Sequence, residues 1–141
     1  MPLFFWVSTM GMIVRYFLSL LIFVIIDAFW LGFVAPSFYR QHIGHLMLPQ
    51  ANLVSALFFY LLFLAGLNLF VLAPHQNASY RTIAGYGAAF GIVTYATFDL
   101  TSQAVFINFP TIVVLVDLSW GAFLSMSISV ITTWILRKKQ T

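Results

Sequence analysis

The chain contains only three acidic residues, Asp27, Asp99 and Asp117, and each lies inside a long run of apolar residues. A carboxylate at the centre of a membrane helix costs about 2.5–3.5 kcal/mol on insertion, so such residues usually face protein or ligand rather than lipid. Carboxylates in that setting can bind a cation, relay a proton or act as a general base. These three positions are therefore the first candidates for function.

The three carboxylates are predicted to lie at similar depths. Asp27 precedes the end of its apolar run at Phe33 by six residues, and Asp117 follows the start of its run at Thr111 by six residues. At 1.5 Å per residue, both lie about 9 Å from the same membrane face. Asp99 is close to the end of its own run at that face. Three carboxylates with one nearby arginine leave excess negative charge, which needs protons, a cation or a cationic ligand.

Aromatic and basic residues near the aspartates complete the candidate ligand site. Trp30 and Trp120 each follow an aspartate in the spacing D-x-x-W, which places the indole one turn from the carboxylate. Arg40 could pair with one aspartate or anchor a lipid headgroup. Tyr95 stands one turn before Asp99 and joins the candidate site. Three further tyrosines, Tyr39, Tyr60 and Tyr80, lie near span ends or interiors and need no special role.

Two histidines offer a separate, weaker candidate. His42 and His45 are three residues apart, so one helical turn would place them on the same face, as a metal site requires. Histidines in a loop at the membrane interface are more often simply exposed. Two histidines alone leave both interpretations open.

Small and polar residues recur every four positions in the last two apolar runs. Such stripes let membrane helices approach closely, and the hydroxyl groups can bond across the contact. Both stripes are therefore expected to face the interior, with the aspartates pointing toward each other. They consist of Gly87, Gly91, Tyr95 and Asp99, and of Asp117, Gly121, Ser125 and Ser129.

The composition indicates an integral membrane protein. Of 141 residues, 62% are apolar and 6% charged, whereas a soluble domain carries about 25% charged residues. The absence of cysteine excludes disulfides and thiolate chemistry. The apolar runs predict an all-α, four-helix transmembrane bundle that forms a single domain over 1–141. The predicted spans are at about 13–33, 53–72, 83–101 and 111–135. The apolar segment before the first span is expected to lie at the interface or to extend the helix.

The basic residues predict the orientation. The loops and termini on one side of the membrane hold five cations and the other side holds only Arg40, which places both termini in the cytoplasm by the positive-inside rule. The loops 35–52 and 102–110 would then face outward. In this pattern the net charge of +3 marks topology and does not indicate nucleic-acid binding. The five cations are Arg15, Arg81, Arg137, Lys138 and Lys139.

Five short segments combine aromatic, small and polar residues within or next to the apolar runs. They are Asp27-x-x-Trp30-Leu31-Gly32, Phe38-Tyr39-Arg40, Ile43-Gly44-His45-Leu46, Tyr95-Ala96-Thr97-Phe98-Asp99-Leu100-Thr101 and Val116-Asp117-x-x-Trp120-Gly121. Taken together, these segments resemble a family of bacterial predicted membrane proteins, the domain of unknown function 2177. The resemblance covers nearly the whole chain from about Val14 and implies a short four-span protein of the bacterial inner membrane, without implying an activity.

Three functions fit these residues. The aspartates could bind or move a cation or small solute, and four spans are few for a transporter, so a homo-oligomer would be expected. One aspartate could instead serve as general base in a membrane-embedded enzyme acting on a lipid-like substrate, with Arg40 holding a headgroup. The cluster could also join helices in an accessory subunit of a larger membrane complex. The sequence favours the first function and identifies no ligand, substrate or cofactor.

Overall fold

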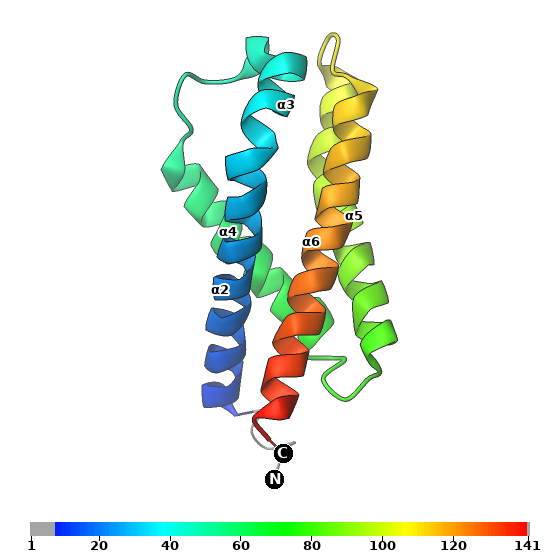
Figure 1. Cartoon of the computed structure of the whole chain (residues 1–141). Coiled ribbons are helices and arrows are strands. Elements are labelled where there is room, and N and C mark those ends of the chain that lie inside the picture. Colours follow the sequence, from blue (N-terminus) through cyan, green and yellow to red (C-terminus); the bar gives the residue numbers. More distant parts are fainter. Residues whose placement is uncertain (1–7, 141) are drawn as a thin grey trace.

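The computed structural model describes residues 8–140, and every regular element in that range is helical. These residues include four long helices: α2 (Thr9–Phe33), α4 (Leu53–Leu67), α5 (Tyr80–Val105) and α6 (Thr111–Lys138). The start of α2 and the end of α6 lie at one end, here called the terminal end (Figure 1). The opposite end, here called the α3 end, carries α3 and the turn between α5 and α6. The all-α prediction is confirmed.

Short polar side chains determine where the helices begin. Ser8 precedes α2 and its hydroxyl accepts a hydrogen bond from the Gly11 amide at 3.1 Å. Asn52 and Ser79 cap α4 and α5 in the same way. A capping oxygen satisfies an amide that the first turn leaves unpaired, so α2 begins earlier than the expected start at residue 13. The rest of the apolar segment before α2, residues 1–7, lies outside the described residues.

The predicted outer loop at 35–52 is partly wrong, because it contains a helix. A break at Val34 ends α2, and α3 (Ala35–Ile43) follows at once, continued by a short turn η1 (Gly44–Leu46). Pro36 lies in the first turn of α3. Proline is tolerated there because first-turn amides have no intrahelical partner, so this residue starts a new helix rather than a loop.

The end of α4 widens into a π-helical segment, η2 (Asn68–Leu72). The amide of Ala73 donates to the carbonyl of Asn68 at 2.9 Å, five residues back. Together α4 and η2 span Leu53–Leu72, the boundaries that the sequence predicts for the second span. A π-helical turn inside an apolar helix often accompanies a polar or functional feature, and here it contains the buried side chain of Asn68.

Helices α5 and α6 pack against each other along their length through the small-residue stripes. A Cβ atom added to Gly91 would lie 1.9 Å from the carbonyl oxygen of Gly121, and one added to Gly121 would lie 2.5 Å from the ring of Tyr95. Only glycine permits this approach. The prediction that both stripes face the interior is confirmed, because their members are buried or half-buried.

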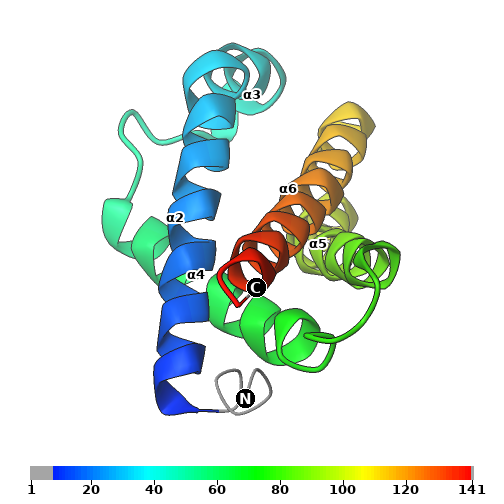
Figure 2. The ribbon, with the colours of Figure 1, turned by 60° about the horizontal axis from the view of Figure 1, so that its bottom comes forward.

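The remaining long helices flank this pair. Helix α2 packs against α6, and α4 crosses the bundle obliquely, so that η2 contacts α5 while the Leu53 end of α4 lies away from it (Figures 1 and 2). The core between them is formed mainly by Phe23, Phe63, Leu64, Leu67, Leu124 and Ile128.

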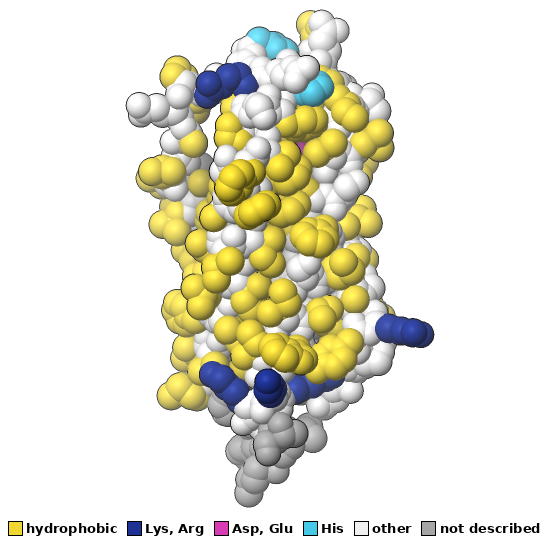
Figure 3. Space-filling model, in the orientation of Figure 1, with side chains coloured by type: hydrophobic (Ala, Val, Ile, Leu, Met, Phe, Trp, Pro, Cys, Tyr) yellow, Lys and Arg dark blue, Asp and Glu magenta, His cyan; other side chains and the backbone are white. Residues whose placement is uncertain are grey.

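Three helices are long and apolar enough to cross a membrane: Thr9–Phe33, Leu53–Leu72 and Thr111–Lys138. The expected third span, 83–101, lies within α5, which is an unbroken helix of 26 residues. The outer surface is a broad hydrophobic band, with most visible Lys and Arg near the terminal end and His at the α3 end (Figure 3).

Candidate functional site

Asp99 of α5 and Asp117 of α6 face each other near the α3 end. Asp99 is 1% exposed and Asp117 is 7% exposed. Their carboxyl groups are close enough to interact through a hydrogen bond when one of them carries a proton. Oδ1 of Asp99 is buried and has no hydrogen-bond partner. This answers a question that the sequence leaves open, because at least two of the three aspartates are in direct interaction.

Tyr39 reaches Asp117 from α3. Its phenol donates a hydrogen bond to Oδ1 of Asp117. Burial raises the pKa of Tyr39 above its ordinary value, and the hydrogen bond to Asp117 and the negative charge of that residue raise it further. The phenol therefore stays protonated and acts as a donor at neutral pH. Without α3, this oxygen of Asp117 would lose its donor.

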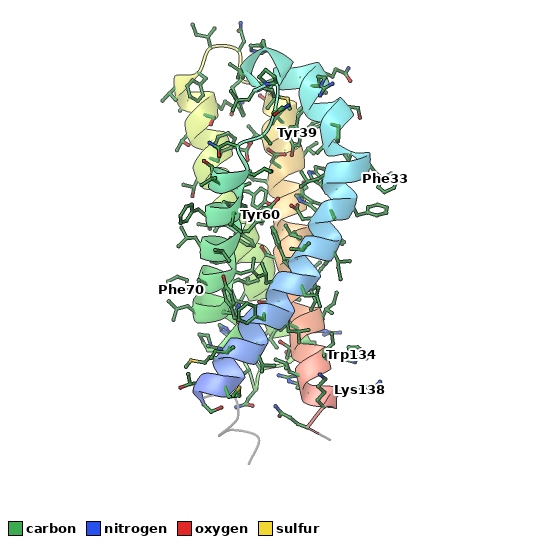
Figure 4. All side chains as sticks on the ribbon, turned by 90° about the vertical axis from the view of Figure 1, so that its left-hand side faces the viewer. Phe33, Tyr39, Tyr60, Phe70, Trp134 and Lys138 are labelled. Carbon is green, nitrogen blue, oxygen red and sulfur yellow. The ribbon has the colours of Figure 1, made fainter. Side chains whose placement is uncertain are left out.

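Asp27 of α2 has its own phenol donor. The Tyr60 hydroxyl of α4 donates to Oδ2 of Asp27 at 3.1 Å, and the carboxylate is 7% exposed. Tyr39 and Tyr60 occupy successive levels in the half of the bundle remote from Lys138 (Figure 4). The expectation that these two tyrosines need no special role is therefore wrong, since each satisfies a buried carboxylate.

The two D-x-x-W segments meet through their indoles. The rings of Trp30 and Trp120 stack with centroids 4.4 Å apart and planes inclined by 12°. Tyr39 contacts Trp30 edge-on at 6.4 Å. The indole Nε1 of Trp120 is buried near Asp27 but makes no well-aligned hydrogen bond. The two stacked indoles therefore lie between the residues around Asp27 and those around Asp117.

Tyr95 lies among all three aspartates. Its phenol interacts electrostatically with Asp27, Asp99 and Asp117, and also with Tyr60. Beside it is a cavity of about 270 Å³. The cavity combines two carboxylates with an aromatic wall, and it is lined by Phe59, Thr94, Tyr95, Phe98, Asp99 and Asp117. The structure therefore brings together six of the predicted ligand-site residues: Asp27, Trp30, Tyr95, Asp99, Asp117 and Trp120.

Arg40 is not part of this cluster. Its side chain is exposed on α3, and within residues 8–140 none of the three aspartates has an arginine among its interaction partners. The anchoring of a headgroup by Arg40 stays a prediction. The pairing of Arg40 with an aspartate does not occur here, because the tyrosines take the donor positions.

His42 lies in α3 and His45 in the following turn η1. Nδ1 of His42 is 2.8 Å from the carbonyl oxygen of Phe38. In the described part of the chain, no group of three or more His, Cys, Asp or Glu residues could hold a metal ion. A metal site at these histidines stays a prediction.

A second polar cluster near the terminal end was missed from the sequence. Arg15, interpreted above only as a topology marker, is 3% exposed, and its Nε donates to Oδ1 of Asn68 at 3.1 Å. The amide nitrogen of Asn68 donates to Ser19 at 2.9 Å and to the Leu64 carbonyl at 2.8 Å. An asparagine within an apolar span was the signal that could have predicted this cluster.

Comparison with known proteins supplies a family and no characterised relative. The sequence model of the family described as "Predicted membrane protein (DUF2177)" matches residues 12–134. No curated protein and no solved structure matches the chain.

Proposed function

The chain belongs to the domain of unknown function 2177 family of predicted membrane proteins, and on this premise we propose that it binds a cation or small cationic solute inside a helical bundle. We place it in the bacterial inner membrane as a multi-pass protein. A homo-oligomer, as expected for a transporter with so few spans, is part of the same proposal.

The proposal includes four crossings with both termini in the cytoplasm. Three helices have the length and apolarity of spans. Helix α5 packs against α6 along its length and is long enough to cross about 30 Å of hydrocarbon at 1.5 Å per residue. Its lower apolarity fits a helix whose polar face is covered by α6. The concentration of Lys and Arg at the terminal end supports a cytoplasmic location for that end (Figure 3).

The observation that carries the ligand proposal is the buried Asp99 oxygen without a partner, beside Asp117 and the cavity. Protein hydrogen bonds satisfy one oxygen of Asp117 and one of Asp27, whereas Oδ1 of Asp99 has none. A buried charge is stable only when it is paired or coordinated. A cation in the cavity would supply positive charge beside this carboxylate pair.

The test is thermal unfolding of the detergent-purified full-length protein with a panel of cations: Na⁺, K⁺, Mg²⁺, Ca²⁺, ammonium and small alkylammonium ions. A ligand that binds only the folded state stabilises it by about 2.7 kcal/mol at a hundredfold excess over Kd. We expect at least one cation to raise the melting temperature, and this rise to be lost in Asp99→Asn.

The matched control is Thr132→Val, which removes a buried hydroxyl with no hydrogen-bond partner from α6, about four turns from Asp117. It should keep the full cation-dependent rise. No rise with any cation would overturn the proposal. A badly destabilised Asp99→Asn with no cation effect in the wild type would instead indicate that the cluster only joins helices, as in an accessory subunit.

A further inference from the structure

The residues that line the cavity beside Asp99 differ in type from those that bind a small inorganic ion. Of its six lining residues, three are aromatic: Phe59, Tyr95 and Phe98. A hard cation such as Ca²⁺ takes six to eight oxygen ligands, whereas this cavity offers two carboxylates and then mainly rings and hydrocarbon. Its volume of about 270 Å³ leaves room for several carbon atoms as well as a charged group.

Three helices contribute to the lining of the cavity. Asp99 and Asp117 come from the α5–α6 contact, while Phe59 comes from α4. Aromatic rings attract ammonium groups through their π faces, and this attraction is strongest where water is excluded. A ligand with an ammonium group at one end and a hydrocarbon body at the other would satisfy both kinds of lining residue.

The rim of the cavity faces the surroundings of the bundle. Phe59 is 43% exposed and Phe98 is 60% exposed, so the two rings bound the cavity where α4 and α5 meet the surface. In this half of the molecule α4 diverges from α5 because it crosses the bundle obliquely (Figures 1 and 2). The neighbouring α4 side chains Val54, Phe58 and Leu62 are between 66% and 75% exposed, which makes this surface suited to lipid rather than water.

We propose that the Asp99–Asp117 cavity is a site for an amphiphilic organic ammonium ion, which enters from the bilayer between α4 and α5. This inference rests on the proposed cation binding and specifies the class of cation. The ammonium group lies beside the Asp99–Asp117 carboxylate pair, and the hydrocarbon body lies against Phe59 and Phe98. Lateral entry keeps the apolar part of the ligand in hydrocarbon throughout.

The experiment compares n-hexylammonium with its neutral counterpart n-hexanol and with K⁺, using the full-length protein in nanodiscs. Binding is measured by calorimetry and by the shift in melting temperature. We expect n-hexylammonium to bind more tightly than either reference. Asp99→Asn should abolish this preference over n-hexanol, because the charge contact is lost.

Two ring variants test the hydrocarbon side. Phe59→Ala and Phe98→Ala truncate side chains outside the buried core, 43% and 60% exposed, so the fold should survive. Each should weaken n-hexylammonium binding by about tenfold. Phe106→Ala is the matched control, since Phe106 is 54% exposed and does not line the cavity. It should bind n-hexylammonium like the wild type.

The outcomes separate this inference from the function on which it rests. Binding of K⁺ or another inorganic cation that depends on Asp99, with no preference for n-hexylammonium, would overturn the inference and leave cation binding intact. Equal binding of n-hexanol and n-hexylammonium that survives Asp99→Asn would show an apolar cavity and overturn the inference. No binding of any cation would overturn both.

Discussion

A carboxylate inside a helical membrane protein needs donors, and in this chain phenols supply them. Tyr39 donates to Asp117 and Tyr60 donates to Asp27. Asp99 differs, because its Oδ1 is buried without a partner. The three aspartates are therefore not equivalent. Two accept a hydrogen bond from a phenol, and Oδ1 of the third has no partner within residues 8–140.

The hydrogen bond between Tyr39 and Asp117 should stabilise the folded protein measurably. Tyr39→Phe removes only the donor, so we expect a double-mutant cycle with Asp117→Asn to give a coupling energy of about 1 kcal/mol. The free energy of unfolding can be measured by titrating the detergent-solubilised protein with sodium dodecyl sulfate.

The matched control for that cycle is Tyr86→Phe. The Tyr86 ring stacks on His75 with centroids 3.9 Å apart, far from Asp117 in the fold, so the phenylalanine should keep the stacking. We expect no coupling between Tyr86→Phe and Asp117→Asn. If the coupling energy between Tyr39→Phe and Asp117→Asn were as small as that between Tyr86→Phe and Asp117→Asn, the hydrogen bond from α3 would contribute nothing to stability.

Sequence could predict the candidate carboxylates but not their donors. Asp27, Asp99 and Asp117 stand out because acidic residues are costly in apolar runs. Tyrosine carries no such cost, so nothing in the sequence distinguishes Tyr39 and Tyr60 from the tyrosines at the membrane interface. Their role depends on how α3 and α4 fold against other helices, and no local pattern specifies that arrangement.

At the scale of the elements, the close contact between α5 and α6 positions Asp99 against Asp117. Gly91→Ala would place a Cβ atom 1.9 Å from the backbone oxygen of Gly121, so the helices must separate. We expect destabilisation by about 1–3 kcal/mol, because overpacking against backbone cannot be relieved by a rotamer change. Any cation-dependent rise in melting temperature should also decrease, because the carboxylates move apart.

Gly85→Ala provides the control on the same helix. No atom lies within 4 Å of a Cβ added to Gly85. Alanine is a better helix former than glycine by up to about 1 kcal/mol, so this variant should be as stable as the wild type or slightly more stable. Equal stabilities of the Gly85 and Gly91 variants would contradict the close helix contact.

The boundaries of the elements were predictable where apolarity or proline marks them. The second span, Leu53–Leu72, and the starting residue of α6, Thr111, agree with the sequence. The start of α2 differs because the cap at Ser8 lies within an apolar segment. Helix α3 was missed because proline marks both the end of one helix and the first turn of another. The widened turn at Asn68 has no signature in local apolarity.

At the scale of the whole molecule, the two ends differ in chemistry. Each of the three acidic residues lies in the half of its helix nearer the α3 end, while most of the Lys and Arg visible in Figure 3 lie near the terminal end. Under the proposed topology, with both termini in the cytoplasm, the candidate site lies in the half of the membrane away from the cytoplasm. This orientation requires α5 to cross the membrane, because α5 connects the loop near Asn77 at the terminal end to the turn near Ile107 at the α3 end.

The natural chain has no cysteine, so single cysteines can report topology without background. Suitable exposed positions are Ser37 and Ile107 at the α3 end, and Asn77 and Gln140 at the terminal end. With four crossings, we expect a membrane-impermeant maleimide to label Ser37→Cys and Ile107→Cys in intact cells. It should label Asn77→Cys and Gln140→Cys only after the membrane is permeabilised.

The pair Asn77→Cys and Ile107→Cys tests the crossing of α5 directly, because the two positions flank that helix. Labelling of both from the same side would mean that α5 does not cross and that only the three apolar helices span the membrane. The wild type, without cysteine, must remain unlabelled throughout. Opposite sidedness of the pair would place Asp99 within the bilayer, where an unpaired carboxylate is costly and a bound cation stabilising.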